Sequence, residues 1–175
     1  MPLETLYEYA LILQFAVSPV ILIALLFVSA PCGKFSRKGW GLRVNSLAAW
    51  MAMEVPAAAT IAVFAVLYRD SIGWGWVFLA IWEFHYIYRT FIFPVTMNHG
   101  RKTFPLSMAL TAMVFNILNG FINGTHLFRL RPVTDPSWFA DPRFIVGLVL
   151  FFLGFAIHFD SDRRIQKQKP GPGHY

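Results

Sequence analysis

The sequence is poor in charged residues and in cysteine, and it has no standard nucleotide-binding loop. Of the 175 residues only 14% are charged, while 57% are hydrophobic and the mean hydropathy is +0.53. About a quarter of the residues in a soluble domain are charged, so this composition indicates an integral membrane protein. The single Cys32 excludes an intramolecular disulfide and belongs to no thiol-redox or zinc motif. Because neither GxGxxG nor GxxxxGK[ST] occurs, a Rossmann or P-loop site is not expected.

The N-terminus also lacks the pattern of a cleavable signal peptide. Residues 1–8 contain two acidic residues and no basic residue before the first apolar run. A signal peptide carries a basic region at that place. The first apolar segment is therefore expected to remain in the protein as a membrane helix.

The hydrophobic pattern predicts an all-α integral membrane protein, a single transmembrane domain over residues 1–175 with no separate soluble domain. Five spans are expected, at about 7–29, 47–68, 73–93, 105–128 and 144–159, followed by a cytoplasmic tail at 160–175. Pro19 and Pro56 fall inside spans, where each is expected to kink its helix. The fifth span is short, so we expect it to begin earlier or to lie tilted among its neighbours.

Basic residues are concentrated on one side of these spans. Ten of them fall in the loops after the first and third spans and in the tail. Four fall on the opposite side: Arg69, Arg129, Arg131 and Arg143. The positive-inside rule then predicts an outside N-terminus and a cytoplasmic tail. The formal net charge of +6 follows from this topology and requires no nucleic-acid partner.

Glu54 is the only charged residue in the apolar run 47–68. A helix of this length is about 33 Å long, so the carboxyl group lies deep in the bilayer. An acid at that depth faces a protein interior or a wet cavity. If neutral in a dry pocket, it can donate a hydrogen bond to a substrate oxygen. The alternative is a polar contact between helices without any chemistry.

The third span carries the other ionisable groups: Glu83, His85, Tyr86 and Arg89. Glu83 and Tyr86 share one helix face, and His85 and Arg89 share the adjacent one. Arg89 lies near the cytoplasmic end, where it either extends to the interface or pairs with a carboxylate. Trp82 and Tyr88 are candidate interface aromatics, and a packed Tyr86 with a satisfied hydroxyl is the alternative to a catalytic one.

In the fourth span, the Gly120-x-x-x-Gly124 pattern allows close approach of another helix, either inside the bundle or between protomers.

The end of the fifth span combines acidic and basic residues. Asp160 and Asp162 are followed at once by Arg163 and Arg164. Basic residues here can hold nucleotide phosphates, and an acidic neighbour can accept from a ribose or an amide. An ordinary basic flank explains the arginines equally well, but it does not explain the aspartates.

These features occur in an order that resembles a known family. The ordered set is Met53-Glu54-Val55-Pro56, His85-Tyr86-x-x-Arg89-Thr90-Phe91, Asn98-x-Gly100-Arg101, Asn119-Gly120, Asp141-x-Arg143-Phe144, and Ser161-Asp162 through Lys169-Pro170-Gly171 to Tyr175. Together they resemble the steroid 5α-reductase family, the 3-oxo-5α-steroid 4-dehydrogenases, in the form of a bacterial member of the inner membrane. The resemblance implies a seven-helix membrane fold that uses NADPH to reduce the C4–C5 double bond of a 3-oxo-4-ene steroid.

The resemblance also implies roles for individual residues. Glu54 and Tyr86 would hydrogen-bond the C3 carbonyl of the substrate. The cofactor NADPH would be bound by residues at the end of the fifth span and in the tail: His158, Asp162, Lys169 and Tyr175. Met53 and Thr111 stand where animal members have Gln and Arg, so they are expected to alter substrate binding. Members of the family continue past the position of Tyr175 with two more helices, so the chain is expected to be a piece of a longer protein.

Two other functions remain open from the sequence. One is reduction of another conjugated lipid, such as an enoyl thioester or a polyprenal. The other is a non-catalytic membrane carrier or chaperone in which Glu54 and Glu83 conduct protons or hold helices together. A carrier would lose activity on substitution of Glu83 as well as Glu54, without dependence on NADPH. The oligomeric state is not predicted.

Overall fold

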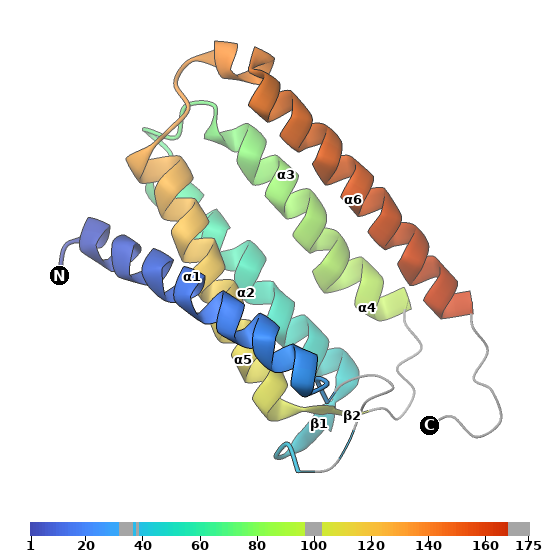
Figure 1. Cartoon of the computed structure of the whole chain (residues 1–175). Helices are drawn as coiled ribbons and strands as arrows, with labels where there is room; N and C mark the ends of the chain where they lie inside the picture. The colour runs from blue at the N-terminus through green and yellow to red at the C-terminus, as the bar shows by residue number, and fades with distance from the viewer. Residues whose placement is uncertain (32–36, 38, 97–102, 168–175) are drawn as a thin grey trace.

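A computed structural model describes residues 1–31, 37, 39–96 and 103–167, and these residues form a helical bundle (Figure 1). The long helices are α1 (Leu3–Phe27), α2 (Ser46–Leu67), α3 (Gly75–Ile87), α5 (Leu106–Thr125) and α6 (Pro142–Lys167). The π-helical turn η2 (Tyr88–Ile92) joins α3 to the short α4 (Phe93–Thr96), and a second π-helical turn, η3 (His126–Leu130), extends α5. A short 3-10 helix, η4 (Pro136–Ala140), precedes α6.

The prediction of an all-α membrane protein is confirmed. Within the described residues, four helical segments are long and apolar enough to cross a bilayer: Leu3–Phe27, Ser46–Leu67, Leu106–Leu130 and Pro142–Lys167. The predicted third span corresponds to the continuous helical run from α3 through η2 to α4. That run does not reach the same hydropathy because it carries Glu83, His85 and Arg89.

The centre of the bundle is the pair formed by α2 and α5. A buried cluster of Ile61, Ala65, Ile72 and Phe128 lies at one end of this pair. Small residues allow the two helices to approach closely, because a Cβ built on Gly120 would lie 2.8 Å from Thr60 Cβ. The Gly120-x-x-x-Gly124 face therefore packs inside the bundle, which decides between the two possibilities that the sequence left open.

Substitution of Gly124 with alanine is expected to destabilise this pair. A Cβ at Gly124 would lie 2.7 Å from Phe64 Cβ, and that atom cannot move without its backbone. Overpacking of this kind costs about 1–3 kcal/mol of the free energy of unfolding. The matched control is Gly154→Ala on α6, where a Cβ meets no atom of the described structure within 4 Å. In thermal denaturation in detergent, the Gly124→Ala variant should have a lower midpoint than the wild type, and the Gly154→Ala variant should not. Equal midpoints for the two variants would contradict the packing.

A two-stranded antiparallel ladder, which the sequence analysis did not predict, precedes α2 and α5. Strand β1 (Arg43–Asn45) pairs with β2 (Thr103–Pro105), with Val44 opposite Phe104. The Arg43 side chain donates to Thr103 Oγ1 and to the Thr103 carbonyl, both at 2.7 Å. Asn45 then caps α2, because its Oδ1 accepts from Ala48 N at 3.0 Å. The ladder thus sets the starting points of the two central helices.

Helix α6 lies along α3 at the edge of the bundle, and aromatic rings fill the contact (Figure 1). The Phe84 ring lies 4.8 Å from Phe155 and 6.0 Å from Phe152, measured between centroids. Offset and edge-on ring pairs of this kind add to the burial of apolar area. The face of α3 that carries His85 is therefore held against α6.

Polar interactions define the two ends of α6. Asp141 accepts from Arg143 N at 2.8 Å and from Arg143 Nη2 at 2.8 Å. The hydrogen bond from the Arg143 side chain, followed by the backbone one, lowers the pKa of Asp141 to about 2. This contact is therefore present above the ordinary carboxyl pKa and is lost as the pH falls through about 2. At the other end, Arg164 pairs with Asp160 at 2.6 Å, one turn apart, and α6 continues to Lys167, past residue 159 where the membrane span is predicted to end.

Candidate active site

Glu54 is buried between helices and is paired with Arg89. Its side chain lies on the inner face of α2, and the residue is 8% exposed. Arg89 Nη2 donates to Glu54 Oε1 at 3.1 Å from the π-helical turn η2. The acid that is isolated in the sequence thus has a cationic partner 35 positions later, as one of the two sequence interpretations of Arg89 proposed. This pair satisfies both charges at a depth where either alone is costly.

The Arg89 side chain is held on several sides. Its guanidinium lies over the Trp50 ring at 4.7 Å and over the Phe93 ring at 5.0 Å. Trp50 Nε1 donates to the Arg89 backbone carbonyl at 3.2 Å. The π-helical turn shifts the register of the helix here, and such turns often occur at functional sites. Arg89 is therefore fixed by packing as well as by its ion pair.

The second terminal nitrogen of Arg89 connects the Glu54–Arg89 pair to α6. Arg89 Nη1 lies 3.1 Å from His158 Nε2. The same imidazole nitrogen lies 3.4 Å from Asp162 Oδ2, one turn further along α6. Tyr88 OH donates to Asp162 Oδ2 at 3.3 Å. Asp162 is only 5% exposed and Tyr88 only 7%, so this is an internal network.

The burial of Tyr88 corrects one sequence interpretation. Tyr88 and Trp82 were candidate interface aromatics, but Tyr88 binds Asp162 and Trp82 Nε1 donates to the Ala57 carbonyl at 3.1 Å. Each ring carries a polar group that finds a partner inside the bundle. Residue type alone does not distinguish an aromatic residue at the membrane interface from one inside the bundle, because an amphipathic ring suits both environments.

Tyr86 lies on the side of α3 that faces α2 and α5. Its side chain interacts with the Asn119 side chain on α5 and lies near the Glu54 carboxyl group. The ring stacks on Trp82, with centroids 5.1 Å apart and an interplanar angle of 30°. The structure therefore brings Tyr86 and Glu54, the two predicted catalytic residues, to the same region.

The other predicted site residues do not all lie near Glu54 and Tyr86. Met53 is buried beside Glu54, and its carbonyl accepts from Asn116 Nδ2 at 2.6 Å. Thr111 is exposed on α5, and its hydroxyl donates to the Ser107 carbonyl of its own helix at 2.9 Å. The structure thus does not bring Thr111 to the network. Lys169 and Tyr175 lie outside the described residues.

Glu83 lies apart from the network, in an open apolar groove of about 260 Å³. The groove is lined by Val55, Ala58, Ala59, Ala62, Glu83 and Phe91. Glu83 Oε1 is buried without a hydrogen-bond partner in the described part of the chain. The two acids of the second and third spans therefore belong to different environments.

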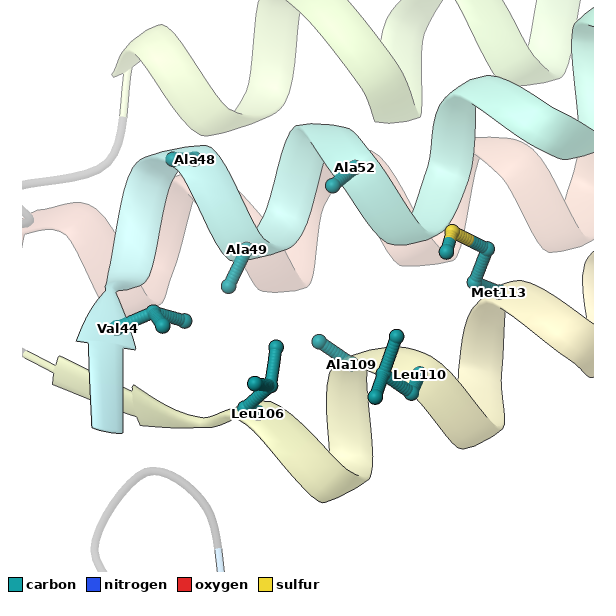
Figure 2. Close-up of a pocket in the computed structure, with 8 residues that line it drawn as sticks. All are labelled: Val44, Ala48, Ala49, Ala52, Leu106, Ala109, Leu110 and Met113. Atoms are coloured by element: carbon teal, nitrogen blue, oxygen red, sulfur yellow. The ribbon is translucent and has the colours of Figure 1, made fainter. Parts of the chain in front are cut away.

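A second pocket, of about 200 Å³, lies between the β-ladder ends of α2 and α5 (Figure 2). Residues of both helices line it, together with Val44 of β1: Val44, Ala48, Ala49, Ala52, Leu106, Ala109, Leu110 and Met113. None of the predicted site residues belongs to this lining. Its apolar surface suits a hydrocarbon group.

The chemistry of the α6 end fits a nucleotide. His158 and Asp162 offer polar atoms on the face that meets Arg89. Arg163, Arg164 and Lys167 follow within two turns and supply positive charge for phosphates. Asp162 is buried, and Tyr88 and His158 are the partners that its carboxyl group finds inside the bundle. The described residues are thus compatible with NADPH.

Sequence reasoning did not identify the links that join these groups. The sequence allowed Arg89 to pair with a carboxylate but did not name Glu54 as that partner, and it did not identify the partners of Trp50 and Asn116. Their partners lie 35 to 69 positions away in the chain, as for Arg89 with Glu54 and His158. The available signal was the intramembrane position of Arg89, since such a cation needs an acidic partner.

Comparisons with known proteins identify the family. The family model described as 3-oxo-5-alpha-steroid 4-dehydrogenase matches residues 102–175. Steroid 5-alpha-reductase DET2 of Arabidopsis thaliana is 31% identical over 178 residues, covering 96% of this chain and 68% of the relative. The 3-oxo-5-alpha-steroid 4-dehydrogenase 1 of Bos taurus is 29% identical over 169 residues, covering 93% and 65%. The 3-oxo-5-alpha-steroid 4-dehydrogenase 2 of Homo sapiens is 33% identical over 155 residues, covering 83% and 59%.

These alignments cover most of this chain but only about two thirds of the Arabidopsis relative, and less of the bovine and human ones. They extend well beyond the segment that the family model matches, and the apolar helices place the chain in a membrane. The resemblance to this family noted in the sequence is thereby confirmed, while a bacterial origin stays a prediction. The chain belongs to the steroid 5-alpha-reductase family, a family of oxidoreductases that act on CH–CH groups.

Proposed function

We propose that the protein reduces the C4–C5 double bond of a 3-oxo-4-ene steroid in the membrane, with NADPH as the reductant. The observation that carries this proposal is the network Glu54–Arg89–His158–Asp162. It connects the acid on α2, near Tyr86, to polar residues of α6 that fit a nucleotide. The relatives with steroid reductase names support the substrate class.

In this proposal Glu54 and Tyr86 hold the C3 oxygen of the steroid. The ion pair with Arg89 uses Glu54 Oε1, and we assign the other carboxyl oxygen, when protonated, to the substrate. Trp82 stacks on the ring of Tyr86, and Asn119 interacts with its hydroxyl group. Hydrogen bonds to the C3 oxygen withdraw electron density from C5 through the conjugated system.

NADPH, when bound, supplies hydride to C5. The negative charge that develops on the C3 oxygen is stabilised by Glu54 and Tyr86, and C4 then takes up a proton that comes from solvent. Donors placed beforehand in a site that excludes water stabilise such an oxyanion strongly, because they need no reorganisation. Burial of Glu54 and the half-buried position of Tyr86 provide such a site. His158 and Asp162 would hold the nucleotide, with Arg163, Arg164 or Lys167 at its phosphates.

The separate location of Glu83 favours the reductase over a proton carrier. A path for protons needs ionisable groups or water within hydrogen-bonding distance of each other. Glu83 lines the open groove on the outer side of α2, whereas Glu54 faces the interior. The two acids therefore do not form one relay among the described residues.

The proposal predicts steroid-dependent oxidation of NADPH. Membranes that contain the protein expressed from its complete gene should consume NADPH on addition of progesterone and form the 5α-reduced 3-oxosteroid. Product identification by mass spectrometry excludes an unrelated NADPH oxidase, and membranes without the gene are the control. Bound NADPH without turnover of any 3-oxo-4-ene steroid would favour another conjugated lipid. Absence of both binding and turnover would contradict an NADPH-dependent reductase.

A further inference from the structure

Glu83 supplies the one carboxyl group among the residues that line the open groove beside α2. The other lining residues, Phe91 and side chains of α2, are apolar. Glu83 Oε1 is buried, and it has no hydrogen-bond partner within the described residues. A carboxyl group keeps an acceptor oxygen whether or not it is protonated, and a buried acceptor without a donor is unfavourable. The donor that the groove lacks therefore has to come from outside the described part of the chain.

The walls of this groove have the composition of a contact between membrane helices. Helix α2 presents Ala58, Ala59 and Ala62 there, and small side chains let the backbone of another helix approach closely. Val55 and Phe91 are 39% and 49% exposed, so apolar surface is left uncovered beside the carboxyl group. At about 260 Å³ and open on its outer side, the groove does not enclose a ligand. Lipid tails could cover the apolar walls, but they offer no hydrogen-bond donor.

The bundle already contains one contact that is built in this way. Between α2 and α5, Gly120 lies against Thr60, and Asn116 Nδ2 donates to the Met53 carbonyl at 2.6 Å. A small residue there brings two helices together, and a polar side chain finds its partner across the contact. The groove offers the alanines of α2 and the Glu83 carboxyl group in the corresponding roles.

The relatives have additional chain that could cover the groove. The alignment with the Arabidopsis relative covers 96% of this chain but 68% of the relative. Gln166 Nε2 donates to Thr96 Oγ1 at 3.0 Å, so the last turn of α6 lies beside the end of α4. Phe91 of the groove precedes Thr96 by five residues in the same helical run. Chain that continues from α6 therefore starts near the Phe91 end of the groove.

We propose that a membrane helix of the complete protein, following Tyr175, lies in this groove and donates a hydrogen bond to Glu83. Small residues of that helix face the alanines of α2, and one of its side chains directs an O–H or N–H group at the Glu83 carboxyl group. Glu83 thus holds the two parts of the protein together. This role depends neither on the steroid nor on NADPH, so it stands or falls separately from the proposed function.

The test is photocrosslinking in membranes that contain the protein expressed from its complete gene. Benzoylphenylalanine replaces Phe91, and on illumination its ketone inserts into a neighbouring C–H bond. Mass spectrometry of the digested protein should locate the crosslink in a peptide that follows Tyr175. The matched control carries the same probe at Phe15, which is 73% exposed on α1, and it should form no crosslink to that part of the chain.

Three results of the Phe91 experiment would overturn the proposal. Adducts with lipid alone would show that the groove faces the bilayer. A crosslinked dimer on a denaturing gel would assign the groove to a second copy of the chain. Crosslinks at the same peptides from both Phe91 and Phe15 would show that the probe does not report a defined contact.

A pair of substitutions tests the hydrogen bond to Glu83. Glu83→Leu leaves the donor of the docked helix unpaired, so it should lower the thermal midpoint of the complete protein by about 2–4 °C and reduce the Phe91 crosslink at least about twofold. Glu83→Gln keeps an acceptor oxygen and should preserve both. If Glu83 met lipid instead, Glu83→Leu would remove a polar group from an apolar environment and raise the midpoint. A raised or unchanged midpoint with an unchanged crosslink would therefore refute the role of Glu83.

Discussion

Turnover of a 3-oxo-4-ene steroid should fall by about 10²–10³ when Glu54 is replaced by glutamine, a typical cost of losing one oxyanion donor. Glutamine keeps the size of the side chain, but its amide is a weaker donor than a carboxylic acid and it cannot form the ion pair with Arg89. The loss should appear in kcat, because the interaction strengthens as charge develops on the oxygen. The measurement is single-turnover reduction of progesterone with saturating NADPH in membranes.

Glu83→Gln is the matched control for this experiment. Glu83 lies in the apolar groove away from the network, so the control should retain turnover. If both variants lose activity equally and the rate of wild type does not depend on NADPH, the proton-carrier function would replace the reductase. Retention of full activity by Glu54→Gln would show that Glu54 is a structural partner of Arg89 alone.

The second large effect is expected for Tyr86→Phe, which should lower kcat by about 10². This substitution removes only the hydroxyl group, so the stacking of the ring on Trp82, with centroids 5.1 Å apart, is kept. The dissociation constant for NADP⁺ should change little, since Tyr86 is directed toward Glu54 and Asn119 rather than toward α6. Rapid-quench measurement of the chemical step, together with NADP⁺ titration, tests both statements.

A suitable control is Tyr9→Phe, because Tyr9 is 61% exposed on α1 and lies outside the network. Thermal denaturation of each variant shows whether folding is preserved. A Tyr86→Phe variant with normal kcat and a raised KM would mean that the hydroxyl contributes to binding of the ground state only. A variant with unchanged kinetics would assign Tyr86 to packing.

Much of the candidate site was accessible from the sequence because each residue type is unusual at its place. An acid such as Glu54 inside an apolar run indicates a protein interior whatever the fold, since lipid does not accept the charge. The ordered motifs around Tyr86 and Asp162 then indicated the family, and the relatives confirm it. Roles that depend on a partner were less accessible, and the pairing of Glu54 with Arg89 is known only from the tertiary structure.

The end of the fifth span shows the same limit. The predicted span ends at 159, and α6 continues past that residue to Lys167. The pairs Asp160–Arg164 and His158–Asp162, each one turn apart, join polar side chains within this last part of the helix. Hydropathy measures the cost of each charge separately, so it predicts where a span leaves the apolar layer and not where the helix itself ends.

The sequence by itself determined the membrane class, the approximate positions of the helices and the family, because these follow from local hydropathy and from motifs that are read along the chain. Only the tertiary structure decided that Gly124 packs against Phe64 inside the bundle, that Glu83 lies apart from Glu54, and that Arg89 joins Glu54 to His158. These facts depend on which faces of distant helices meet. That choice results from packing over the whole bundle, and no local pattern contains it.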